Sequence, residues 1–188
     1  MNDTVRRLQA HWVYGGALSG AVLLVLSPLL TAGWPLAERL VYLALPVYML
    51  HQLEEHDGDR FRAFVNEVIG KGREVLSVRT VFVVNVVGVW GVMVLAIWLM
   101  RSVSPGWGLI GVYLLLVNAV LHVAQAVALR RSNPGLWTAV LLFLPLGVVA
   151  FSQIATMANS TQHAVSLAVV LALHGAIVVG VRRRLAAS

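Results

Sequence analysis

The sequence predicts an all-α fold, a polytopic transmembrane bundle of about six helices in which residues 1–188 form a single integral membrane domain. Three observations favour this class. The chain of 188 residues is 59% hydrophobic and only 12% charged, whereas soluble domains carry about 25% charged residues. The mean hydropathy is +0.82. Six apolar stretches each approach the ~20 helical residues that cross a hydrocarbon core. A protein of this size cannot bury this much apolar surface in its own interior. We therefore expect the lipid bilayer to cover much of that surface.

The six expected spans are separated by turn-forming or polar stretches, which mark where each helix ends. The spans run roughly over residues 12–33, 38–56, 79–100, 107–129, 135–157 and 163–181. The clearest breaks between them are Gly33-Trp34-Pro35, Ser104-Pro105-Gly106, Asn133-Pro134-Gly135 and Asn159-Ser160-Thr161-Gln162. The first apolar run is long, so we expect it to be a membrane span rather than a signal peptide.

The connection over residues 57–78 has an amphipathic pattern of its own. Its apolar residues follow the i, i+3, i+4, i+7, i+8 spacing of one helix face, at Phe61, Phe64, Val65, Val68 and Ile69. This spacing predicts a short interfacial helix over about residues 60–70, lying on the cytoplasmic leaflet. A simple surface anchor is the favoured interpretation of this helix, and a lid that gates a substrate is the alternative.

Lysine and arginine are distributed very unevenly between the two sides of this alternating arrangement. Of the 14 basic residues, one side receives only Arg39 and Arg101. The other side receives Arg6, Arg7, Arg60, Arg62, Lys71, Arg73, Arg79, Arg130, Arg131, Arg182, Arg183 and Arg184. The positive-inside rule then predicts a multi-pass protein of the cell membrane with both termini in the cytoplasm. Topology thus accounts for the net charge of +6, and no nucleic-acid partner is expected.

Histidine or glutamate side chains occur inside three of the spans, where they are costly and indicate function. The second span ends with His51, Glu54 and Glu55, and the i+3 and i+4 spacing places both carboxylates on the helix face of the imidazole. The fourth span contains Asn118 and His122, which share a face at i and i+4. The sixth span contains a lone histidine, His174. By contrast, His163 lies at the opposite end, where we expect a solvated boundary residue.

The three intramembrane histidines are expected at nearly one depth. His51 lies six residues before Asp57, His122 eight before Arg130, and His174 eight before Arg182. At 1.5 Å per residue, these separations place them about 9, 12 and 12 Å from the charged boundary. His56 and Asp57 are expected at the water boundary itself. The sequence therefore predicts one polar layer in the cytoplasmic half of the bundle.

These residue types suit a divalent metal ion, either zinc or iron. Imidazole and carboxylate one helical turn apart are a common way for a helix to hold a metal. A histidine from another helix completes a three-ligand site, and two histidines with one carboxylate also suit non-haem iron. The predicted metal ligands are His51, Glu54, Glu55, His122 and His174. The second carboxylate, Glu54 or Glu55, would act as general base, and Asn118 would orient a ring or bind a substrate oxygen.

The motifs in these spans resemble those of the HXXEE-domain membrane proteins. His51-Gln52-Leu53-Glu54-Glu55 matches the motif that names this family, and Asn118 with His122 matches its NXXXH motif. A third signature of the family is YXPG, and here Ser132-Asn133-Pro134-Gly135 retains the proline and glycine without the tyrosine. The resemblance implies that these histidine, glutamate and asparagine residues form a shared metal or acid–base site. It brings no general activity with it.

The leading functional hypothesis is a membrane-embedded metalloenzyme that acts on a lipophilic or amphiphilic substrate from the cytoplasmic leaflet. Hydrolysis is slightly preferred over oxidation, because a dinuclear iron site needs more carboxylates than the two available. A metal-free isomerase or cyclase using a Glu/His proton-transfer pair is the first alternative. A transporter or metal-handling protein is less favoured, because the two halves show no internal repeat. A purely structural membrane protein is the remaining alternative.

Overall fold

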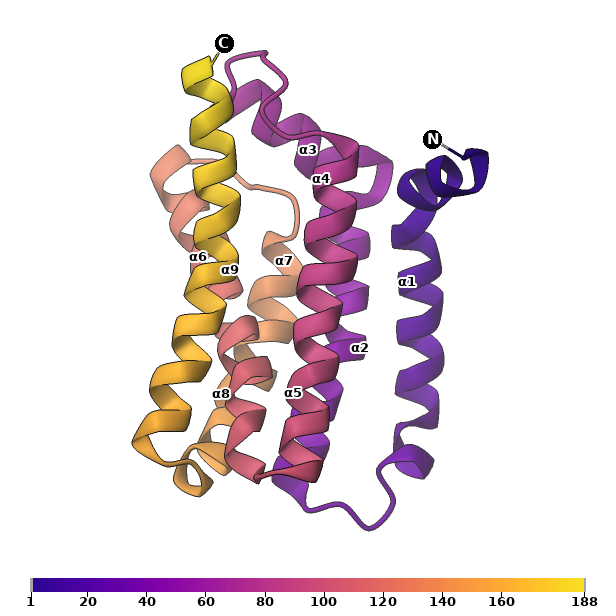
Figure 1. Ribbon diagram of the computed structural model, residues 1–188, viewed down its shortest axis with the longest axis vertical. Coiled ribbons are helices and arrows are strands. Elements are labelled where there is room, and N and C mark those ends of the chain that lie inside the picture. The colour runs from indigo at the N-terminus through magenta and orange to yellow at the C-terminus, as the bar shows by residue number, and fades with distance from the viewer. Residues whose placement is uncertain (1, 188) are drawn as a thin grey trace.

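The computed structural model describes residues 2–187. This part of the chain forms six long helices that run in alternating directions (Figure 1). The first two are α1 (Asp3–Leu30) and α2 (Leu36–His56). The other four are α4–η3–α5 (Val78–Phe82, Val83–Trp90, Gly91–Ser102), η4–α6 (Pro105–Gly108, Leu109–Leu129), α7–η5–α8–η6 (Leu136–Thr138, Ala139–Phe143, Leu144–Ile154, Ala155–Met157) and α9 (Ser160–Ala187). The predicted all-helical bundle is therefore confirmed.

Five of the long helices are individually long and apolar enough to span a membrane, and α2 is the exception. Most residues of α2 are buried, including the charged or polar Glu38, His51, Gln52 and Glu55. This helix packs against α1, α5, α6 and α8, so protein rather than lipid surrounds much of its surface. A helix enclosed in this way can carry polar residues that a lipid-facing helix cannot, and α2 is the one that carries the HXXEE motif.

The first and last helices of the chain, α1 and α9, are longer than the sequence predicts. The first starts at Asp3 rather than near residue 12, and the last continues to Ala187 rather than residue 181. Hydropathy marks only the apolar part of a helix, whereas backbone hydrogen bonding continues through the flanking polar residues. The side chain of Asn2 accepts a hydrogen bond from the Thr4 amide at 3.1 Å and so caps the first helix. Both ends of the described chain lie at the same end of the bundle (Figure 1).

The expected short helix between the second and third spans is present and lies across that same end of the bundle (Figure 1). It comprises α3 (Arg60–Phe64) and the π-helical turn η2 (Val65–Ile69), and follows the 3₁₀ turn η1 (Asp57–Asp59). Its residues Phe64 and Val65 are buried in a cluster with Val75, Leu76, Val81 and Val181. The short helix therefore packs onto the bundle and covers its end.

Two of the long helices contain π-helical turns close to the polar end of α2. These are η3 in the third long helix and η5 in the fifth. A π turn bonds residue i to i+5 rather than i+4, so it places one extra residue in the turn. Phe143, the last residue of η5, is fully buried, and its ring centroid lies 4.2 Å from that of His51. These turns thus shape the walls around the HXXEE segment.

Candidate metal centre

The structure brings three predicted site residues together, His51 and Glu55 from α2 and His122 from α6. One ligating atom of each lies within 4.8 Å of the others. All three side chains are buried, with 0%, 6% and 5% of their surfaces exposed. A carboxylate and two imidazoles from neighbouring helices therefore converge inside the bundle.

The separations within this group fit a shared ion better than direct hydrogen bonds. His51 Nε2 lies 3.6 Å from Glu55 Oε2, and His122 Nε2 lies 3.5 Å from Glu55 Oε1. Hydrogen bonds between nitrogen and oxygen are normally 2.7–3.2 Å long. Ligands placed 2.0–2.2 Å from a tetrahedral zinc ion lie about 3.3–3.6 Å apart. Each imidazole–carboxylate distance is therefore compatible with two neighbouring ligands of a metal ion.

Thr138 on α7 and Glu54 on α2 together orient the His51 ring. His51 Nδ1 lies 2.8 Å from Thr138 Oγ1, and the Thr138 hydroxyl donates to Glu54 Oε2 at 2.5 Å. Because that hydroxyl proton is used by the carboxylate, the Thr138 oxygen accepts the proton of His51 Nδ1. The opposite nitrogen, Nε2, then carries the lone pair that faces Glu55. Such outer contacts fix the ring orientation of metal-binding histidines.

Asn133 performs the same task for His122. The Asn133 amide donates to the backbone carbonyl of His122 at 2.8 Å, which turns its Oδ1 atom toward His122 Nδ1 at 2.7 Å. His122 Nδ1 therefore donates, and its Nε2 lone pair also faces Glu55. In the neutral form of both rings, two Nε2 lone pairs therefore face one carboxylate, an arrangement that a cation stabilises. Among the described residues, His51 Nε2 has no hydrogen-bond partner.

Gly135 brings the turn before α7 directly over the two imidazoles. Its backbone φ of +90° lies in the left-handed region that favours glycine. A Cβ atom at this position would lie 2.8 Å from Cε1 of both His51 and His122. Only glycine lets the chain approach so closely, so this turn closes one side of the group. The glycine of the Ser132-Asn133-Pro134-Gly135 stretch is therefore part of the site.

The other predicted site residues lie near the group without joining it. Glu54 points to the start of α7, where it accepts hydrogen bonds from the Trp137 and Thr138 amides at 3.2 and 2.7 Å. Asn118 donates to the Tyr48 hydroxyl at 2.9 Å, which leaves its buried Oδ1 unpartnered within residues 2–187. The Nδ1 atom of His174 lies 2.9 Å from the Val170 carbonyl.

His56 does not occupy the expected water boundary. It is 6% exposed, and its Nε2 lies 3.1 Å from Glu55 Oε2. Its ring packs against Trp12 and Phe61, with ring centroids 5.1 and 5.4 Å away. The short helix after α2 folds back over His56, which the sequence pattern does not predict. Glu55 thus faces imidazoles from three positions, two on its own helix and one on α6.

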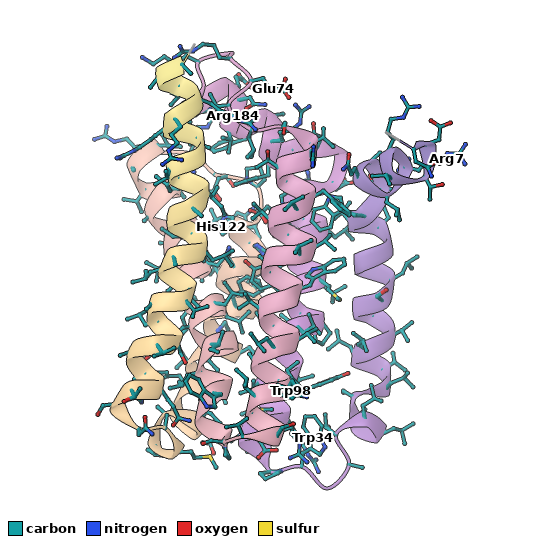
Figure 2. All side chains as sticks on the ribbon, viewed as in Figure 1. Arg7, Trp34, Glu74, Trp98, His122 and Arg184 are labelled. Atoms are coloured by element: carbon teal, nitrogen blue, oxygen red, sulfur yellow. The ribbon has the colours of Figure 1, made fainter. Side chains whose placement is uncertain are left out.

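A cavity of about 600 Å³ lies against the group. Its polar lining residues include Glu55, Asn118, His122 and His174. Most of the other lining residues are aliphatic, and they come from α6, α9, the third long helix and the short helix. Figure 2 shows His122 deep in the bundle, with Arg184 toward the end where the chain terminates. The polar group therefore lies at the inner part of a largely apolar chamber.

Comparison with known proteins identifies the family through the same region. Residues 42–150 match the family model described as a protein of unknown function with HXXEE motif. No curated protein and no solved structure matches the chain. The matched region includes the three converging residues together with Asn133, Gly135 and Thr138, which surround them. More than half of the chain is matched, so the protein belongs to the HXXEE family.

Proposed function

We propose that this protein is a membrane-embedded metal-dependent enzyme that acts on a lipophilic or amphiphilic substrate. One observation carries the proposal: two imidazole Nε2 atoms, each with the opposite nitrogen engaged, lie 3.5–3.6 Å from the oxygens of one buried carboxylate. The apolar cavity beside this group supports a greasy substrate, since ligand sites are concave, largely apolar and have few polar groups.

Two histidines and one carboxylate are the ligand set of zinc hydrolases and of mononuclear iron(II) oxygenases. Bound zinc would supply Lewis acidity for hydrolysis, and bound iron(II) would supply oxidative chemistry. We retain a slight preference for hydrolysis, since a dinuclear iron centre needs more carboxylates than the single one in this group. The metal-binding residues in this proposal are His51, Glu55 and His122, with His174 as a further candidate.

The remaining residues position the ligands and the substrate. Thr138 and Asn133 hold the two rings, and Glu54 acts through Thr138 instead of acting as a free base. The unpartnered Oδ1 of Asn118 lines the cavity and would accept a hydrogen bond from a substrate N–H or O–H group. The surrounding aliphatic side chains exclude water, which strengthens electrostatic interactions at the centre.

The proposed orientation places the arginine-rich end of the bundle in the cytoplasm. The 12 basic residues assigned to that side belong to the end with the short helix and the chain termini, and the positive-inside rule carries the assignment. The cavity would then admit substrate from the cytoplasmic leaflet of the cell membrane. The short helix contributes Phe61, Val65 and Ile69 to the cavity lining, which supports the gating interpretation alongside the anchoring one.

Elemental analysis of the detergent-purified protein tests the proposal. We expect about one zinc or iron per chain in the wild type and loss of that metal in His51→Ala and His122→Ala. The matched control is His163→Ala, because His163 is a hydrogen-bonded histidine remote from the group, and it should retain the metal. A metal-free wild type, even after supplementation during expression, would refute the metal centre, as would equal loss in all three variants.

A metal-free acid–base enzyme, such as an isomerase or cyclase, is the second candidate. The observation that favours it is the proximity of His56 Nε2 to Glu55 Oε2, which lie 3.1 Å apart without the alignment of a hydrogen bond within residues 2–187, since catalytic pairs often align only when substrate binds. Activity in protein that contains no stoichiometric metal, abolished in Glu55→Gln, would support this candidate over the metalloenzyme.

A further inference from the structure

We propose that the cavity binds a long-chain carboxylate, with the head group on Arg182 and the alkyl chain running inward to Glu55 and His122. The assignment of this molecule as a substrate rests on the proposed function. Its binding does not, since it depends only on the walls and rim of the cavity.

The first argument is the shape and polarity of the walls. One face of α9 contributes Leu173, Ile177, Val181 and Leu185, which recur at the three- to four-residue spacing of a helix stripe. The facing helices add side chains such as Leu121 and Val84. A volume of about 600 Å³ lies within the range of pockets that hold one small molecule. The chamber therefore suits a single alkyl chain better than a two-chain lipid.

The second argument is the charge at the rim. Arg182 lines the cavity and is exposed, and its side chain forms no hydrogen bond or ion pair within residues 2–187. Two nearby arginines have partners: Arg184 donates to Thr80 Oγ1 at 3.2 Å, and Arg131 lies 4.8 Å from the Phe64 ring centroid. A guanidinium left without a partner beside an apolar chamber is complementary to a carboxylate, which it can bind through two parallel hydrogen bonds.

The third argument is the distance between the rim and the inner polar group. His174 and Arg182 lie on the same helix, eight residues apart, so about 12 Å separates their levels at 1.5 Å per residue. An extended alkyl chain with bonds of about 1.5 Å advances roughly 1.25 Å per carbon. The chain carbon at the level of His174 would therefore be about the tenth from the carboxylate. The geometry thus assigns the carboxylate to the rim and about the tenth carbon of the chain to the inner part of the cavity.

Photo-crosslinking tests this inference in the full chain reconstituted into phosphatidylcholine nanodiscs. The probes are two C16 fatty acids that carry a diazirine at carbon 3 or at carbon 10. We expect the carbon-3 probe to label residues near Val181 and Leu185, and the carbon-10 probe to label residues near Leu121 and Leu173. In Arg182→Gln, loss of the charge-assisted contact should reduce labelling by roughly tenfold.

The matched control is Arg183→Gln, which removes the same charge one residue away, outside the cavity lining. It should label as the wild type does. The methyl ester of each probe should be insensitive to both substitutions. Absence of cavity labelling, identical label positions for the two probes, or equal labelling of the two arginine variants would overturn the inference. Metal content is measured on the same samples, so a metal-free but specifically labelled protein would count against the proposed function alone.

Discussion

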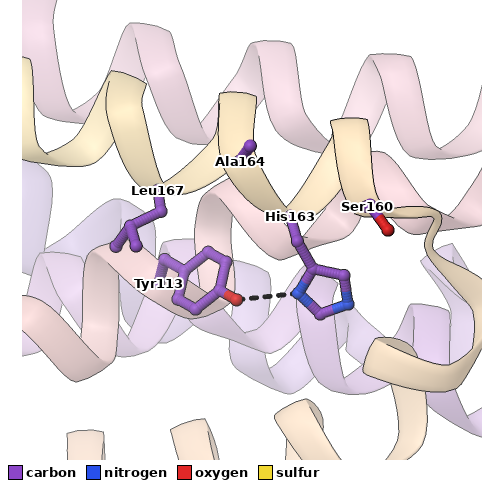
Figure 3. A pocket seen from close by; sticks show the side chains of 5 residues that line it. All are labelled: Tyr113, Ser160, His163, Ala164 and Leu167. Carbon is purple, nitrogen blue, oxygen red and sulfur yellow. Dashed lines mark hydrogen bonds between the residues drawn. The ribbon is translucent and has the colours of Figure 1, made fainter.

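The two ends of the bundle contain histidines in contrasting environments. At the end opposite the cavity, His163 Nδ1 pairs with the Tyr113 hydroxyl at 2.8 Å (Figure 3), and its Nε2 lies 3.1 Å from the Ala155 carbonyl. Both ring nitrogens are therefore engaged by protein. His51 and His122 each have only Nδ1 engaged in this way, and each directs Nε2 at Glu55.

This difference separates a structural histidine from a candidate ligand. Polar groups inside a membrane bundle are stabilised when each has a partner, and His163 meets that condition. An imidazole held at one nitrogen by an outer oxygen, with the other directed at a carboxylate, is oriented as metal ligands are. The number of engaged ring nitrogens is thus more informative than burial or depth, and each prediction below tests that distinction.

The largest effect is expected for Gly135→Ala. The added methyl group would lie 2.8 Å from both imidazoles, short of the 3.4 Å of an ordinary contact, so each ring would have to shift by about 0.6 Å, more than a precise site tolerates. We expect metal affinity to fall at least 100-fold, measured by competition with a chelator. Gly33→Ala is the matched control, because Gly33 also has a positive φ but nothing lies within 4 Å of its added Cβ. Equal metal binding by the two variants would contradict this account.

A smaller effect is expected for Thr138→Val, which preserves shape but removes the hydroxyl between Glu54 and His51. Loss of such an outer contact typically costs 10–100-fold in metal affinity. Thr138→Ser should restore most of it, because serine keeps the hydroxyl. At the opposite end of the bundle, Thr31→Val removes a hydroxyl bonded to the Ser27 carbonyl and should leave metal affinity unchanged. Failure of serine to rescue would indicate a packing role for Thr138.

The smallest effect is expected for Tyr113→Phe, which removes one hydrogen bond from His163. A single neutral hydrogen bond contributes about 1 kcal/mol to stability, so the free energy of unfolding should fall by about that amount in a denaturant titration in mixed micelles. Metal content should remain that of the wild type. A metal-depleted Tyr113→Phe protein would show that the two histidine environments are not independent.

Much of the arrangement follows from the sequence. The spans appear as apolar runs, and the common depth of His51 and His122 follows from counting residues back from charged boundaries. The choice between Glu54 and Glu55 does not follow. Both lie about one turn from His51, yet successive residues point about 100° apart on a helix. Tertiary packing decides the matter, since Glu55 faces α6 and Glu54 faces the start of α7.

The sequence also does not reveal the residues that orient the rings. Asn133 lies in a turn, where asparagine is common for backbone reasons alone, and Thr138 lies in an apolar run where a hydroxyl is unremarkable. Their roles depend on the fold of the 130–135 turn, in which Arg130 and Gly135 both take positive φ. Only the Pro134-Gly135 pair signals that turn, and it does not indicate that the chain returns over His122.

The π-helical turn η5 has a consequence for tracing ancestry. A π-helical turn contains one residue more than the α-helical turn it replaces. Relatives in which this turn is α-helical should therefore align with a one-residue gap between residues 139 and 143. In a comparison that allows no gap, all residues after this point would then be misaligned by one position. The HXXEE and NXXXH motifs both precede this point, on α2 and α6, so a gap within η5 leaves their alignment unchanged.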